Sequence, residues 1–68
     1  MIDTNKLSYF IKKSGLKKKY IADQLGICLS TFSRKLNNKV DFTISQIRLL
    51  CEILNIDDKD RDEIFFRQ

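Results

Sequence analysis

One short segment of the sequence combines hydroxyl and guanidinium side chains at helical spacing. Ser30, Ser33 and Arg34 fall on the exposed face of a helix expected over residues 29–37, with Thr31 beside them. Short hydroxyls can approach phosphates or base edges, and a guanidinium can donate paired hydrogen bonds to O6 and N7 of guanine. Arg34 is therefore a candidate base contact, and the alternative is an ordinary surface charge that meets phosphate only.

Three consecutive lysines open the preceding helix, which is expected over residues 17–25. Such a run is usually a solvated surface. The N-terminus of a helix, however, also presents backbone N–H groups and the positive end of the helix dipole, and both favour a phosphate. No Ser, Thr or Asp caps this helix, so a bound phosphate can take that role. We expect phosphate contacts here, at Lys18 and Lys19.

The two helices that carry these side chains are joined by a tight turn. Ala22 is small enough for the second helix to cross closely, and Gly26, four residues later, accepts a positive φ at no steric cost. Two apolar i,i+4 pairs let the helices share one core: Ile21 with Leu25, and Phe32 with Leu36. This layout predicts a helix-turn-helix, whose second helix can enter the major groove of DNA.

Composition predicts an all-α fold in a single small domain that spans residues 1–68. The chain is 43% apolar, has no proline, and places both glycines between helices. We expect a compact five-helix, repressor-like DNA-binding domain with the helix-turn-helix formed by helices 2 and 3. The approximate bounds are 5–14, 17–25, 29–37, 44–54 and 58–66.

Local signals mark several helix ends. Asp3 or Thr4 caps the first helix, and Gly15 supplies its left-handed stop. Thr43 and Gln46 match a capping box at the start of the fourth helix, and Asp57 or Asp58 caps the fifth. The side chains expected to face inward are Leu7, Phe10 and Ile11 on the first helix, and Ile44, Ile47, Leu50, Cys51 and Leu54 on the fourth.

The chain offers little for catalysis or metal binding. It has no histidine, and its two cysteines, Cys28 and Cys51, are far apart, which excludes zinc sites of the CxxC type. We expect neither an enzyme nor a cofactor, metal or small-molecule ligand. The N-terminus does not resemble a signal peptide, and the most apolar window, residues 47–56, is interrupted by charges. A soluble, cytoplasmic protein is the expectation.

Charge is divided unevenly along the chain. Residues 1–40 hold nine basic and two acidic side chains, a net charge of +7, whereas residues 41–68 carry −3. The predicted helix-turn-helix lies inside the basic part, where a phosphate-facing surface requires it.

Two neighbouring residues at the start of the helix over 29–37 remain ambiguous. Leu29 continues an apolar stripe with Phe32 and Leu36, which favours the core, but its place at the helix start would point it at a thymine methyl. Cys28 stands where Ser or Thr would normally cap the helix. It is either a tolerated small residue or, as a thiolate near lysines, a redox switch.

Phe65 and Phe66 are unusual in a charged C-terminal segment. Neighbouring residues lie about 100° apart on a helix, so one ring can pack on the core while the other stays exposed. The pair therefore predicts either a dimer interface or simple closure of the core.

The segment from Ile21 to Lys39, followed by the helix from Thr43 to Leu54, resembles the phage repressor/Cro-type (XRE-like) helix-turn-helix family. The resemblance spans roughly residues 5–56 and is most similar to small prophage regulators with a recognition helix reading STFSRKLN. It implies base contacts by Leu29, Ser30, Ser33 and Arg34. It implies phosphate contacts by Lys18, Thr31, Asn37, Asn38 and Lys39.

This chain departs from the family pattern at three positions. Cys28 and Leu29 replace polar residues usual at the start of the recognition helix. Asn38 stands where a glycine often follows, although asparagine tolerates a left-handed conformation.

These observations favour a sequence-specific regulator that binds double-stranded DNA and represses by occupying a palindromic operator, as a homodimer at least on DNA. The sequence carries no second domain, which favours a Cro-like, stand-alone regulator on the nucleoid. The rival is a protein-interaction module, such as an anti-repressor, that uses the acidic C-terminal part with Phe65 and Phe66.

Overall fold

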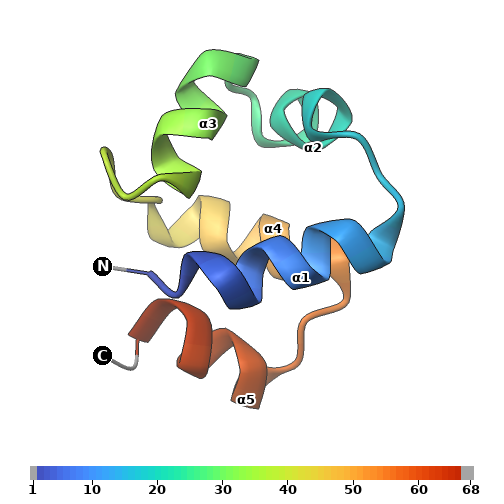
Figure 1. The fold of residues 1–68 in the computed structure, drawn as a ribbon, viewed down its shortest axis with the longest axis vertical. Coiled ribbons are helices and arrows are strands. Elements are labelled where there is room, and N and C mark those ends of the chain that lie inside the picture. Colours follow the sequence, from blue (N-terminus) through green and yellow to red (C-terminus); the bar gives the residue numbers. More distant parts are fainter. Residues whose placement is uncertain (1, 67–68) are drawn as a thin grey trace.

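Helices follow one another along the whole part of the chain that the structure describes, residues 2–66. In this computed structural model they are α1 (Thr4–Ser14), α2 (Lys18–Leu25), α3 (Leu29–Leu36), α4 (Ile44–Leu54) and α5 (Asp58–Arg61), and α5 continues as the π-helix η1 (Asp62–Phe66) (Figure 1). No strand occurs between residues 2 and 66. The expected five-helix, all-α architecture is confirmed.

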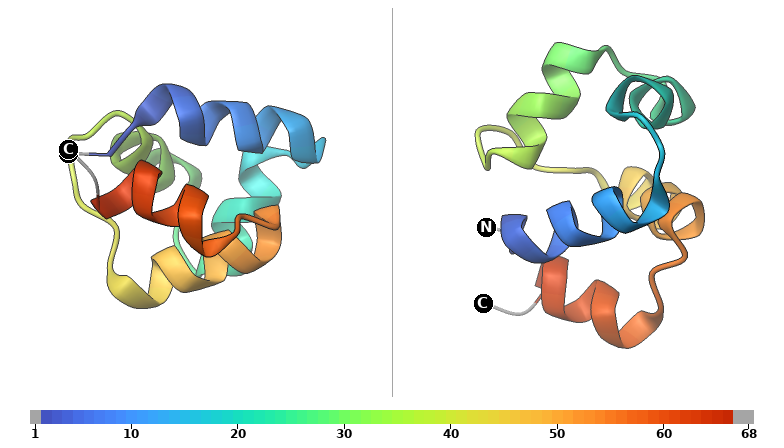
Figure 2. Two further views of the ribbon diagram at one scale, coloured as in Figure 1. Left: turned by 90° about the horizontal axis from the view of Figure 1, so that it is seen from below. Right: turned by 45° about the vertical axis from the view of Figure 1, so that its right-hand side comes forward.

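The helices pack in three tiers. α1 and α4 cross in the middle, α2 and α3 lie together on one side, and α5 with η1 covers the other side (Figures 1 and 2). A backbone hydrogen bond of 2.8 Å from the Asp3 N–H to the Ile64 carbonyl ties the start of α1 to η1. α3 and α5 therefore lie at opposite ends of the molecule (Figure 1).

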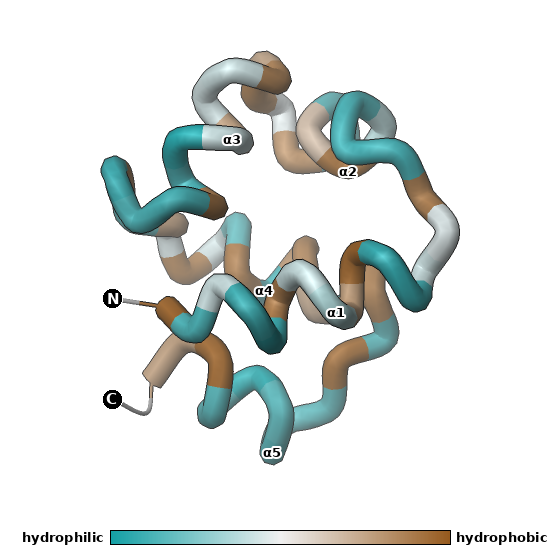
Figure 3. Tube along the Cα trace, in the orientation of Figure 1, coloured by the Kyte–Doolittle hydropathy of each residue, from teal (hydrophilic) through white to brown (hydrophobic). Residues whose placement is uncertain are grey.

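The core draws side chains from every tier. Its five largest fully buried side chains are Leu7, Ile21, Phe32, Leu50 and Ile64, which come from α1, α2, α3, α4 and η1. Apolar and polar residues accordingly alternate along the helices (Figure 3). Edge-to-face rings link the tiers, because Phe42 lies 6.2 Å from Phe32 and 5.9 Å from Phe65 between ring centroids.

Most of the predicted helix ends are confirmed. The Asp3 carboxylate caps α1, Gly15 ends it at φ 72°, and Thr43 with Gln46 forms a complete capping box on α4. Asp57 caps α5 by accepting a 2.8 Å bond from the Asp60 N–H. Lys17 proves to be the N-cap of α2 rather than its first residue.

Two expectations about the second half of the fold were wrong, the burial of Ile44 and a dimer contact by Phe65, and the last helix differs in its type. Ile44 is 66% exposed rather than buried, because it is the first residue of α4 and the inward stripe begins one turn later, at Ile47. The last helix spans the predicted residues 58–66, but it widens into a π-helix where the adjacent Ile64 and Phe65 both reach the core. Phe65 is only 7% exposed and belongs to that core, so it offers no surface for a dimer contact, whereas Phe66 is 52% exposed.

No helix within residues 2–66 is long and apolar enough to cross a membrane.

Candidate nucleic-acid interface

The turn between α2 and α3 fixes the angle of the helix pair. Gly26 has φ 74°, a left-handed conformation that glycine adopts without penalty. Its N–H donates to the Asp23 carbonyl and the Ile27 N–H to the Ala22 carbonyl, both at 3.1 Å, which closes the end of α2. Ala22 is fully buried. The expected helix-turn-helix geometry is present.

The inner face of α3 is locked into the core, and its outer face is open. Phe32 and Leu36 are buried, whereas Ser30 and Arg34 are exposed and Ser33 is half-buried. Leu29 is 42% exposed, so the core interpretation of this side chain was wrong. The four residues predicted to contact bases therefore share a surface that starts at the first turn of α3.

At the N-terminus of α3, the Cys28 thiol hydrogen-bonds two neighbouring hydroxyl groups. The exposed Cys28 Sγ lies 3.2 Å from Ser30 Oγ and 3.1 Å from Thr31 Oγ1. Hydrogen bonds from these two hydroxyls lower the pKa of the Cys28 thiol to about 7, because they stabilise the thiolate. Thr31, a predicted phosphate contact, is thus turned toward the start of the helix, where its backbone N–H groups also point.

The N-terminus of α2 gathers positive charge. Lys17, Lys18 and Lys19 are all exposed there, and Lys19 makes a 3.3 Å ion pair with Asp23 one turn along. Lys12 of α1 borders a shallow hollow of about 270 Å³ together with Lys18. Lys12 belongs to the basic half of the chain but was not among the predicted phosphate contacts.

The C-terminal end of α3 is held by polar contacts. Asn37 and Lys39 are exposed, as phosphate contacts require. Asn38 adopts φ 60°, and its side-chain amide both accepts from the Ile2 N–H at 2.9 Å and donates to the Ile2 carbonyl at 3.2 Å. The left-handed conformation expected of Asn38 is confirmed, and its amide is largely committed to the N-terminal segment.

Lys35 departs from the role that its charge suggests. Its side chain is buried, its ammonium donates a 2.7 Å bond to the Asp41 carbonyl, and it lies 5.7 Å from the centre of the Phe42 ring. This lysine therefore fastens α3 to the loop before α4. The apolar stripe could have revealed it, because Lys35 lies three residues after Phe32 and next to Leu36.

The acidic end of the molecule lies away from the helix-turn-helix. Lys6 of α1 bridges Asp60 at 3.1 Å and Glu63 at 2.7 Å, and these carboxylates raise the pKa of Lys6. Arg61 pairs with Asp58 and Asp62. Lys6 and Arg61 are thus bound to carboxylates of this end, whereas Lys17 and Lys18 at the start of α2 are exposed and make no ion pair within the described residues.

Comparison with known protein families identifies the family of this domain. A family model described as the Cro/C1-type HTH DNA-binding domain matches residues 6–60. The chain belongs to the Cro/C1-type helix-turn-helix family. No curated protein and no solved structure matches it. The Cro/C1-type match covers α1 to α4 and the start of α5, and it therefore includes the helix-turn-helix formed by α2 and α3.

Proposed function

We propose that this Cro/C1-type domain is a sequence-specific transcriptional repressor that places α3 in the major groove of an operator. The observation that carries the proposal is the division of α3 into a core-locked face and an open face that holds Arg34. The base contacts are Leu29, Ser30, Ser33 and Arg34. The phosphate contacts are Lys18, Lys19, Thr31, Asn37, Asn38 and Lys39. Repression follows from occupation of a palindromic operator by a homodimer in the cytoplasm.

The chemistry of the open face limits the operator sequence. Arg34 suits a guanine, and the exposed Leu29 suits a thymine methyl. The two residues are five positions apart, which is about 7.5 Å of helix rise, and base pairs are stacked about 3.4 Å apart. With α3 along the groove, each half-site therefore contains a thymine and a guanine about two base pairs apart.

Selection of bound duplexes from a random pool tests this proposal and supplies the operator. On that operator Arg34→Ala costs about 1–3 kcal/mol of binding free energy and relaxes preference at one base pair. Arg34→Lys is the matched control, because it keeps the charge but loses the paired geometry. It retains binding to random DNA and loses the same base preference. Equal losses on operator and random DNA would contradict base reading by Arg34.

The proposed phosphate contacts can be recognised by the salt dependence of DNA affinity. Lys18→Ala weakens binding to every duplex similarly and lowers the slope of log affinity against log salt by about 1. Lys59→Ala is the matched control, since Lys59 is exposed on α5, at the opposite end from α3. An unchanged slope in Lys18→Ala would contradict the contact. Complete absence of binding to random DNA at low salt would instead favour a protein-interaction module.

A further inference from the structure

A short segment ahead of α1 lies between the α3–α4 loop and η1 (Figure 1). On the side of the loop, the Asn38 amide accepts from the Ile2 N–H at 2.9 Å and donates to the Ile2 carbonyl at 3.2 Å. On the side of η1, the Asp3 N–H donates to the Ile64 carbonyl at 2.8 Å. The half-buried side chain of Ile2 also packs against the core. We call Ile2 and Asp3 the N-terminal strap, and it links the loop to the opposite side of the fold.

The loop that the strap holds, residues 37–43, carries proposed phosphate contacts. Asn37 and Lys39 are exposed there, and the Lys39 N–H donates to the Arg34 carbonyl at 2.9 Å. The other end of the loop is held by the buried Lys35, whose ammonium donates to the Asp41 carbonyl at 2.7 Å. The loop is thus tied on both sides of its exposed residues. A loop that is already ordered loses less conformational entropy when it binds a ligand.

The residue type at position 38 is explained by the strap. Asn38 has φ 60°, a conformation for which glycine is the simplest choice. Asparagine tolerates the same conformation and adds an amide that glycine lacks. This amide uses its oxygen and one N–H on the main chain of Ile2, so little of it is left for a phosphate.

We propose that Asn38 is a positioning residue, which acts through the N-terminal strap to hold the loop where Asn37 and Lys39 meet the DNA backbone. The inference rests on the proposed function, and it makes the part of Asn38 in phosphate binding indirect. α3 itself is held in the core by Phe32 and Leu36. Loss of the strap therefore weakens binding to every duplex alike and leaves the base preference of α3 intact.

A double-mutant cycle on DNA affinity tests the inference. Asn38→Gly keeps the left-handed backbone but removes the amide, whereas Ile2→Ser removes the side chain that packs the strap on the core. Each variant weakens binding to the selected operator and to random duplex by the same factor, about fivefold. The double variant binds no more weakly than the weaker single variant, because both changes break one link. Circular dichroism and thermal unfolding set conditions under which all variants are folded.

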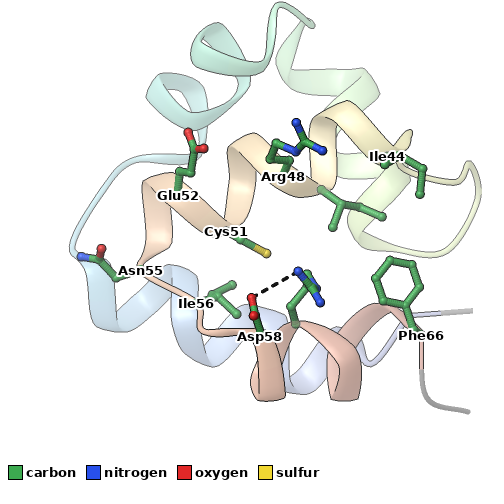
Figure 4. A pocket seen from close by; sticks show the side chains of 10 residues that line it. Ile44, Arg48, Cys51, Glu52, Asn55, Ile56, Asp58 and Phe66 are labelled. Atoms are coloured by element: carbon green, nitrogen blue, oxygen red, sulfur yellow. Dashed lines mark hydrogen bonds and ion pairs between the residues drawn. The ribbon is translucent and has the colours of Figure 1, made fainter.

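Asn55→Gly is the matched control. Asn55 also has a positive φ, 55°, but it ends α4 beside the groove between α4 and α5 (Figure 4), at the other end of that helix from the loop. This variant keeps the wild-type DNA affinity. An equal loss in Asn55→Gly would overturn the inference, since the added glycine would then be the cause. Losses that multiply in the double variant would also overturn it and leave Asn38 as a direct phosphate contact.

Amide hydrogen exchange of the free chain separates this inference from the proposed function. Asn38→Gly and Ile2→Ser each speed the exchange of the Lys39 amide at least about tenfold relative to the amides of α4, and Asn55→Gly does not. Unchanged Lys39 exchange in Ile2→Ser overturns the inference whether or not DNA is bound. A wild-type chain that binds no duplex, with the expected exchange, contradicts the proposed function but not the link between the strap and the loop.

Discussion

Helices α4 and α5 begin with a side-chain cap, whereas helices α2 and α3 begin without one. α4 starts with a reciprocal capping box, in which Thr43 Oγ1 accepts from the Gln46 N–H at 3.1 Å and the Gln46 side chain accepts from the Thr43 N–H at 3.0 Å. α5 is capped by Asp57. Within residues 2–66, only α2 and α3 begin without a side-chain capping bond, at Lys17 and Cys28.

If the proposed phosphate contacts hold, this difference marks the helix starts at which stability is given up for binding. A side-chain cap contributes about 0.5–2 kcal/mol, and its absence leaves backbone N–H groups at the helix start without that partner. At α2 and α3 these groups stand among lysines and hydroxyls, where a phosphate oxygen can accept from them. The capped α4 and α5 instead support the fold.

Phe32→Ala is expected to lower the unfolding free energy the most, because it removes the side chain that anchors the buried face of α3 in the core. Phe32 belongs to α3 but is fully buried, so its loss costs about 3–5 kcal/mol of unfolding free energy. Urea denaturation measures this cost. Arg34→Ala on the opposite face serves as the control and changes stability by less than about 0.5 kcal/mol. Similar costs for the two variants would mean that α3 has no distinct inner and outer faces.

Thr43→Ala tests the capped region. It removes the capping bond and lowers the unfolding free energy by about 0.5–2 kcal/mol, whereas Thr43→Ser keeps the bond and loses much less. DNA affinity under conditions where both variants are folded stays at the wild-type value. A loss of affinity in folded Thr43→Ala would place this cap in the DNA surface and contradict the comparison.

Lys17→Ser tests the uncapped region against Lys17→Ala, which removes the same charge without adding a cap. The serine variant is more stable than the alanine variant by about 1 kcal/mol in thermal or urea unfolding. It also binds random duplex DNA more weakly than the alanine variant, because the new hydroxyl occupies an N–H that a phosphate would use. Equal DNA affinity of the two variants would argue against a phosphate at this helix start.

The two cysteines are expected to differ in the reactivity of their thiols, which is the smallest of the predicted effects. Cys28 is exposed with a pKa of about 7, so its alkylation by iodoacetamide in the folded protein rises to half its maximum near pH 7. Cys51 is buried, and burial raises its pKa, so it reacts only after unfolding. Mass spectrometry of digests assigns the two rates. Bound DNA protects Cys28 if α3 enters the groove, and reaction of both thiols at one rate would contradict the contrast.

Signals within one or two turns predicted most of the fold. The capping box at Thr43, the glycine stops at Gly15 and Gly26, and the apolar i,i+4 pairs each depend on neighbouring residues, so the sequence contains the whole cause. The charge division also predicted that the DNA-binding surface lies in the basic half of the chain. The family match confirms that the chain is a DNA-binding helix-turn-helix domain.

The residues that were misjudged depend on contacts between distant segments. Periodicity placed Ile44 in the core, but this first residue of α4 lies one turn before the buried stripe, which begins at Ile47. Lys35 was one of the nine basic residues counted in the basic half of the chain, and nothing local indicated that its long apolar stem lets the ammonium reach the Asp41 carbonyl. The bonds of Asn38 to Ile2 join residues 36 positions apart, which no local pattern predicts.

Chemical methylation of guanine N7, which lies in the major groove, tests the central claim most directly. Dimethyl sulfate is applied to the selected operator, free and bound by the wild-type chain or by Arg34→Ala at saturating concentration. We predict that the wild-type chain protects one guanine N7 in each half-site and that Arg34→Ala leaves it reactive while protecting the other contacts. Unchanged guanine protection in the variant, or protection confined to the minor groove, would contradict recognition by α3.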